Sequence, residues 1–257
     1  MPIKSSPLVY LKPTILYLIA YILTIMVHEF SHGIMATAVG IPAVVFPFYT
    51  NISRTMGSVT DKAIISVIGP FVSITVGLTC LFLFRQVKNT GLKLFFLYAY
   101  LLGISIFLGN MFSAYMTGDF NRFFNLLGYK PWIKIVVTAI GLLGLMAFMY
   151  SVGKIFIRFT TSGKYSKKGT IMSTIFFPWV LGTFIYIVVL LPLPGELIMG
   201  IVTSSFFWLF SIAGAWFHKI KSGEALLQLN KTTLTELIIL ILCVILIRMI
   251  SHGVSLL

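Results

Sequence analysis

The sequence predicts an all-α polytopic membrane protein with about seven transmembrane helices and a short extended or re-entrant segment after the first. Two properties of the 257 residues support this fold class: 58% are hydrophobic and only 10% are charged. Soluble domains carry about 25% charged residues, so this composition lies far outside their range. The third property is that apolar runs of about 20 residues, the length that crosses a hydrocarbon core, recur along the chain.

Taken in order, the apolar runs predict spans at residues 14–39, 63–84, 94–116, 132–157, 171–191, 197–217 and 234–250. No polar connection is long enough for a soluble domain, so we expect a single membrane domain over 1–257. Its first three spans, within 14–128, carry the polar motifs described below, and the four spans within 129–257 have no assigned role. Cys80 and Cys243 lie in apolar runs and are expected to be buried hydrophobes.

The connection after the first span is unusual because it is apolar and β-branched. It is interrupted by Pro42 and Pro47 and is followed by a polar, glycine-containing turn at 51–60. Proline ends a helix and favours extended backbone in the residue before it. Backbone at membrane depth has to be paired or has to line a watery cavity. The segment therefore predicts a short extended strand or hairpin, and an ordinary interfacial loop is the alternative.

The net charge is +13, from 19 Lys and Arg residues against 6 Asp and Glu residues. In the seven-span arrangement about two thirds of the cations fall on the side of the amino terminus, which the positive-inside rule places in the cytoplasm. The cations cluster in short connections between spans, and no motif that reads RNA or DNA is present. We therefore expect the lipid bilayer, and no nucleic acid, as the partner of these charges.

Glu29 is the only charged residue between Lys12 and Arg54, and it lies within the predicted first span. It belongs to the sequence His28-Glu29-Phe30-Ser31-His32. On a helix, two histidines four residues apart face the same side and can bind one zinc ion, with the glutamate beside them. The alternative is a pair of packing histidines with a buried glutamate, but a buried carboxylate without a partner is costly. The motif therefore predicts a site for one Zn²⁺ ion within the membrane.

A catalytic zinc site has three protein ligands and an open position for water. Positions on the same side of the membrane as the far end of the first span leave four candidates for the third ligand: Asp61, Asp119, Glu196 and His252. We favour Asp119, which follows the third span. A straight helix would carry Asp119 too far from His28, so the chain is expected to unwind between Asn110 and Gly118 and to fold back. The alternative for Asp119 is a solvated helix cap.

Three features of these residues resemble the site-2 protease family of intramembrane zinc metalloproteases (peptidase family M50). The first is the run from His28 to Gly33, followed by Gly40-Ile41-Pro42, which is similar to the zinc helix and the turn after it. The second is Gly69-Pro70 in the second span. The third is Asn110 nine residues before Asp119, although no proline lies between them and Phe120 replaces the usual glycine. The resemblance covers about residues 14–128.

The resemblance implies an endopeptidase that cuts transmembrane segments of membrane proteins or signal peptides. His28, His32 and Asp119 would bind the zinc ion, and Glu29 would act as the general base. Asn110 would hydrogen-bond the substrate backbone or the oxyanion. A substrate helix must unwind before it is cut, and the segment containing the residues Val44, Val45 and Phe46 is expected to bind it by strand addition.

Two other functions are compatible with the same ligands: a non-catalytic relative that binds membrane segments, and a metal-ion carrier. Glu29 distinguishes them, because only the peptidase requires a base at this position. The expected location is the cell membrane, with several membrane passes. The resemblance implies a site that opens toward the cytoplasm, whereas the distribution of cations places that side outside. The sequence leaves this choice open, together with the substrate and the oligomeric state.

Overall fold

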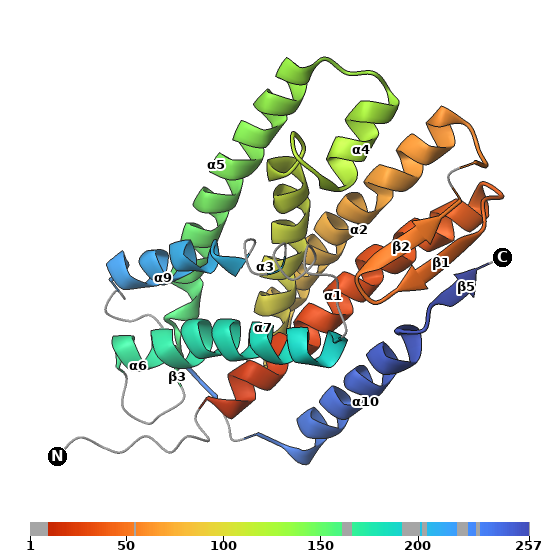
Figure 1. Cartoon of the computed structure of the whole chain (residues 1–257). Helices are drawn as coiled ribbons and strands as arrows, with labels where there is room; N and C mark the ends of the chain where they lie inside the picture. The colour runs from red at the N-terminus through yellow and green to blue at the C-terminus, as the bar shows by residue number, and fades with distance from the viewer. Residues whose placement is uncertain are drawn as a thin grey trace.

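The computed structural model describes residues 10–53, 55–160, 166–191, 201, 205–219, 226–229 and 232–256. Within these residues five helices are long and apolar enough to cross a membrane. They are α1 (Leu11–Ala38), α2 (Val59–Gln86), α3 (Thr90–Phe112), α5 (Pro131–Phe156) and the continuous helix Lys167–Leu190. The last of these consists of α6 (Lys167–Ile171), the π-helical turn η2 (Met172–Phe176) and α7 (Phe177–Leu190). Figure 1 shows the arrangement.

These five helices coincide with the first five predicted spans, so the all-α membrane class is confirmed at that level. The sixth predicted span, 197–217, lies partly outside the described residues, and its described end is α9 (Trp208–Phe217). The seventh is α10 (Leu234–Ile250), a helix of 17 residues. A count of seven spans therefore stays a prediction.

Helices α7 and α10 run in the same direction as α1. Near the start of α1, the ring centroids of Tyr10 and Phe177 are 4.4 Å apart, and further along, those of Tyr21 and Tyr186 are also 4.4 Å apart. For α10, Lys12 Nζ lies 2.7 Å from the Glu236 carboxylate, so both helices start at the same end of the molecule. This parallel direction is what spans one, five and seven of a seven-span chain require.

Close packing between the helices depends on small residues. At Gly103 of α3 a Cβ would lie 2.6 Å from the Ser73 carbonyl oxygen of α2, so these helices approach closely only because the side chain is absent. Between α5 and α9, a Cβ at Gly153 or Gly214 would collide with backbone of the opposite helix. Membrane helices associate in this way because lipid gives no hydrophobic driving force for their contact.

The π-helical turn η2 is explained by Pro178 at the start of α7. Proline has no N–H, so the carbonyl of Thr174 cannot accept the hydrogen bond that an α-helix would supply from position 178. The buried Tyr98 hydroxyl donates to this carbonyl oxygen at 2.7 Å instead. A neighbouring helix thus satisfies a backbone group that proline leaves without a partner, as membrane interiors require.

A small antiparallel sheet lies beside the carboxyl half of α1 (Figure 1). Its strands are β1 (Ala43–Phe46), β2 (Tyr49–Ile52) and β5 (Val254–Leu256), in the order β2-β1-β5. The predicted extended hairpin is therefore present, and the interfacial loop is not. The strand β5, which follows α10, was not predicted. Gly33 of α1 makes room for the sheet, because a Cβ there would collide with Val45 and lie 2.8 Å from Leu256.

The expected break after the third span is also present. Helix α3 ends at Phe112, a series of turns follows, and α4 (Gly118–Leu126) starts with Gly118 at a φ of 88°. Such a φ is in the left-handed region, which glycine adopts without a Cβ penalty. The chain reverses here and brings α4 against α2. A second pair of short strands, β3 (Phe159–Thr160) and β4 (Leu227–Gln228), connects segments far from this region.

Candidate metal centre

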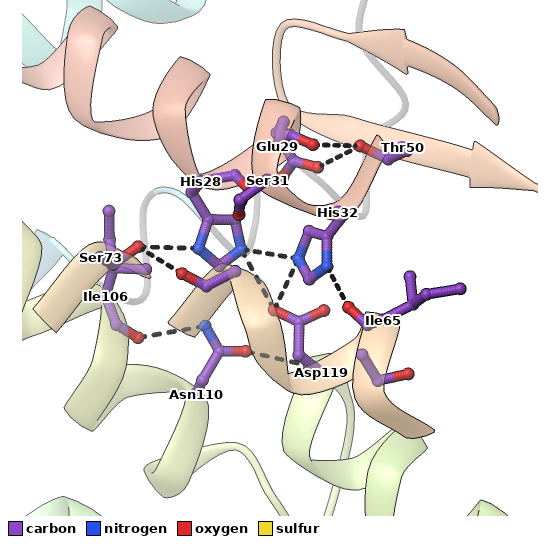
Figure 2. Close-up of polar contacts among 12 residues, drawn as sticks. His28, Glu29, Ser31, His32, Thr50, Ile65, Ser73, Ile106, Asn110 and Asp119 are labelled. Atoms are coloured by element: carbon purple, nitrogen blue, oxygen red, sulfur yellow. Dashed lines mark hydrogen bonds and ion pairs between the residues drawn. The ribbon is translucent and has the colours of Figure 1, made fainter. Parts of the chain in front are cut away.

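Three side chains from α1 and α4 meet at one point (Figure 2). His28 and His32 are one turn apart on α1, and their Nε2 atoms are 3.2 Å apart. The Oδ2 atom of Asp119 lies 3.1 Å from His28 Nε2 and 3.5 Å from His32 Nε2. Within the described residues this is the group of histidine, cysteine and acidic side chains that is arranged to hold a metal ion.

The partners of the two Nδ1 atoms show where the imidazole protons are. His32 Nδ1 lies 2.6 Å from the carbonyl oxygen of Ile65, which only accepts, so this nitrogen carries the proton. His28 Nδ1 lies 2.9 Å from Ser73 Oγ, and that hydroxyl donates its own proton to the Gly69 carbonyl. Ser73 therefore accepts from His28 Nδ1. In both neutral rings the Nε2 lone pair is left unprotonated and directed at the other ligands.

Two Nε2 atoms and a carboxylate oxygen that converge in this way could hold a metal ion. A tetrahedral zinc ion with bonds of about 2.0–2.1 Å separates its ligand atoms by roughly 3.3 Å. The three observed separations, 3.1, 3.2 and 3.5 Å, fit one face of such a tetrahedron.

Gly69 of α2 provides the space for both imidazoles. A Cβ at this position would collide with His32 Nε2 and would lie 2.8 Å from His28 Cε1. The same turn of α2 supplies the Ile65 carbonyl to His32, and Ser73 one turn later contacts His28. The glycine of the Gly69-Pro70 pair is thus placed where any side chain would displace the ligands.

Glu29 lies on α1 between the two histidines and is buried with them. The Thr50 hydroxyl of β2 is 3.0 Å from Glu29 Oε2 and 2.9 Å from the Glu29 carbonyl oxygen (Figure 2). Thr50 donates to this carboxylate, so the hairpin holds one of its two oxygens. The hairpin therefore orients the carboxylate that the sequence predicts as the base.

Asn110 forms two hydrogen bonds within the protein, one of them across the turn before α4. Its Oδ1 accepts from the backbone N–H of Asp119 at 3.1 Å, and its Nδ2 donates to the Ile106 carbonyl at 3.1 Å (Figure 2). Each end of the amide thus makes one hydrogen bond within the protein, and Asn110 does not line the cavity at the site. These contacts fix the turn that presents Asp119. They do not use the second N–H of Nδ2, so a hydrogen bond from Asn110 to the substrate stays a prediction.

A cavity of about 200 Å³ opens on the metal ligands. Its walls come from α1, from the hairpin at β2, from the start of α2 and from α4. The lining residues are His28, Glu29, His32, Phe48, Tyr49, Thr50, Ile52, Ile65, Ser66, Asp119 and Arg122.

The expected substrate strand is in a different position. Val44, Val45 and Phe46 lie on β1, the central strand, which pairs with β2 on one side, while β5 pairs with Val44 and Val45 on the other. Because β5 covers the second edge of β1, this strand cannot receive another strand while β5 is in place. None of the three residues lines the cavity, whereas β2 does.

Two of the other candidates for the third ligand lie away from the site. Asp61 forms the capping box of α2 with Ser58, and its carboxylate accepts from Ser58 at 2.7–2.8 Å. His252 is exposed in the turn after α10. Glu196 lies outside the described residues.

Sequence reasoning missed Thr50, Ser73 and Arg122. The contacts of Thr50 with Glu29 and of Ser73 with His28 depend on how the hairpin and the second span pack against the first span. The sequence does not show that packing. Arg122 carries a local signal, because it lies three residues after Asp119 and so on the same face of a helix.

Comparison with protein-family models, with curated proteins and with solved structures finds no match for this chain. The chemistry of the site is therefore argued from its own residues. They form a group of three side chains that could hold a cation, with an adjacent carboxylate and an open cavity. With a metal ion bound, this is the set of groups needed to activate water.

Proposed function

We propose that this chain is an intramembrane zinc metalloprotease of the cell membrane, similar in its site to the site-2 proteases. The observation that carries the proposal is the convergence of His28, His32 and Asp119 beside Glu29, on a helix long and apolar enough to cross a membrane. A soluble zinc hydrolase has no reason to bury such a group in that helix, where polar side chains are costly.

Each residue of the site has a separate role in the proposed reaction. His28, His32 and Asp119 would hold one zinc ion, which would supply a Lewis acid for activating water and polarising a carbonyl group. Glu29 accepts the proton of the attacking water at the carboxylate oxygen that Thr50 does not hold, and passes it to the leaving nitrogen. Ser73 and the Ile65 carbonyl fix the imidazole orientation and keep the Nε2 atoms free for the ion.

The substrate is a transmembrane segment or signal peptide that has unwound into extended form. Strand β2 is the better place for it than β1, because β2 lines the cavity and, within the described residues, pairs only with β1. A peptide added to the outer edge of β2 would lie between the hairpin and the zinc ligands.

The test uses the full chain reconstituted in liposomes with single-span proteins and signal peptides as substrates. Glu29→Gln is expected to lower cleavage by about 100-fold or more while zinc stays bound, because only the proton acceptor is lost. His28→Ala and Asp119→Ala are expected to lose zinc, measured by elemental analysis. His252→Ala, an exposed histidine outside the site, is the matched control and should retain both zinc and activity.

Cleavage that Glu29→Gln leaves undiminished would end the protease proposal. Zinc transport without cleavage, unaffected by Glu29→Gln, would identify a metal-ion carrier. Segment binding without cleavage would identify a non-catalytic relative. Full zinc content in Asp119→Ala would reassign the third ligand.

A further inference from the structure

Arg122 is the one cation among the residues that line the metal cavity. It lies in α4, three residues after Asp119, so the two side chains leave the same face of the helix about one turn apart. Its side chain is exposed at the cavity, while the zinc ligands are deeper. Arg122 belongs to none of the motifs in the sequence, and it is not among the proposed catalytic groups.

Helix α4 is held firmly enough to fix where Arg122 can reach. Phe120 and Phe124 are buried against side chains of α2, α3 and α5. Asn121 Nδ2 donates to the carbonyls of Ala114 and Tyr115 at 2.9 and 3.0 Å, which ties the helix to the turn before it. The backbone at Arg122 is therefore fixed relative to Asp119, so its guanidinium can reach only groups within one side-chain length of this point of the cavity.

Within the described part of the chain, no carboxylate lies within ion-pair distance of Arg122. The four described acidic residues are each engaged elsewhere. Their partners are as follows: Glu29 with Thr50, Asp61 with Ser58, Asp119 with the two imidazoles, and Glu236 with Lys12. A guanidinium has five N–H donors in a planar arrangement that suits a carboxylate. The described residues place no carboxylate against Arg122.

The charges of the cavity also favour an anionic ligand. With a divalent ion bound, the ion balances the carboxylates of Glu29 and Asp119, and the two imidazoles are neutral. The net charge of the cavity is then one positive charge, that of the Arg122 guanidinium. In a partly enclosed space between helices this charge is screened less than on an open surface, so it selects for a negative group.

We propose that Arg122 binds a carboxylate of the substrate peptide, close to the bond that is cut. This inference rests on the proposed function and names its substrate class: segments with an Asp or Glu side chain, or a free carboxyl terminus, within about two extended residues of the scissile bond. Peptide is the expected source of the carboxylate because the opposite wall of the cavity is the strand β2, whose backbone offers hydrogen bonds to an extended chain.

The experiment uses the reconstituted full chain and sets of peptides that differ at one group. One set compares Asp with Asn at each position near the cut, and another compares a free carboxyl terminus with its amide, so that the two sources of carboxylate are separated. We expect wild type to prefer one acidic form by about 10- to 100-fold in kcat/KM, the range for a charge-assisted hydrogen bond. Arg122→Gln should abolish the preference while the neutral peptide is still cut.

Further variants sharpen the test. Arg122→Lys should keep part of the preference, because the charge remains and the fork is lost. Arg122→Glu should reverse it in favour of a Lys-containing peptide. Lys130→Gln removes an exposed cation that follows α4 but does not line the cavity, and it should leave the preference unchanged.

The result that overturns the proposal is an equal preference in wild type and Arg122→Gln. A loss of the same size for acidic and neutral peptides in Arg122→Gln would also overturn it, and would assign Arg122 to transition-state stabilisation. If no peptide is cut in a Glu29-dependent manner, the proposed function fails separately. Binding of the same peptides to the zinc-loaded Glu29→Gln variant then decides the role of Arg122 without any cleavage.

Discussion

Each of the three candidate metal ligands, and Glu29 beside them, contacts one further residue that sets its proton or its position. Ser73 and the Ile65 carbonyl orient the imidazoles, Asn110 holds the backbone of Asp119, and Thr50 holds Glu29. Such outer contacts commonly change metal affinity or activity by 10- to 100-fold when they are removed. The contacts therefore allow metal binding and proton transfer to be disturbed separately.

Gly69→Ala is expected to lower zinc affinity by at least about 10-fold, because the added methyl group displaces the imidazoles of His28 and His32. Zinc content after dialysis against a graded chelator measures the effect. Gly109→Ala is the control, since a Cβ at Gly109 of α3 meets nothing within 4 Å. Equal zinc retention in both variants would show that the packing of α2 on α1 is looser than the structure has it.

Thr50→Val is expected to lower kcat by about 10-fold and to leave zinc content unchanged. Valine has the same shape as threonine but cannot donate to Glu29 Oε2, so the carboxylate loses the contact that orients it. Thr50→Ser should restore most of the activity, because it keeps the hydroxyl. A loss of zinc in Thr50→Val would assign the residue to the fold of the hairpin and not to the base.

The residues that sequence alone identifies are those linked by a helical period. His28, Glu29 and His32 share one turn of a helix, so their relation follows from spacing. Asp119 was selected by depth and by elimination, and its approach to the imidazoles could be argued because Gly118 permits a break. Thr50 and Ser73 are 21 and 45 residues from their partners, and no local pattern encodes those contacts.

At the scale of elements, the breaks in the helices are better predicted than the pairing of strands. Pro42 and Gly118 mark where backbone leaves the helical path, and the structure has both breaks. The pairing of β5 with β1 joins residues about 210 positions apart. Neither segment has a sequence feature that indicates which edge of β1 the strand β5 pairs with. For this reason the sequence predicts an open strand at Val44–Phe46, although β5 pairs with Val44 and Val45.

Removal of residues 254–257, which ends the chain at Gly253, is expected to uncover the second edge of β1. Amide hydrogens of β1 that depend on this pairing should then exchange at least about 10-fold faster, as hydrogen-exchange mass spectrometry can measure. His252→Ala, which alters the neighbouring exposed residue and keeps β5, is the control. Unchanged exchange over 43–46 would mean that the strand contributes no protection.

At the scale of the whole molecule, the first five spans follow from length and hydropathy because a membrane helix satisfies its own backbone. The directions of the helices do not follow from composition. The parallel course of α1, α7 and α10 rests on contacts such as that of Lys12 with Glu236, which join distant parts of the chain. These contacts place the start of α1 and the metal site toward opposite ends of the helix bundle, so orientation decides which compartment the cavity faces.

The distribution of Lys and Arg predicts that the metal-site end faces away from the cytoplasm. The test starts from a chain in which Cys80 and Cys243, both buried, are replaced by Ala. One cysteine is then introduced at the exposed Met56, between the hairpin and α2, or at the exposed Lys88, between α2 and α3.

In intact cells a membrane-impermeant maleimide should label Met56→Cys, and it should label Lys88→Cys only after the membrane is permeabilised. The two positions flank the same helix, so each is the control for the other. The reverse pattern would place the metal site toward the cytoplasm, as the resemblance to site-2 proteases implies. In that case the cations at the start of α1 would serve to bind the helix ends to lipid headgroups and would not report the orientation of the chain.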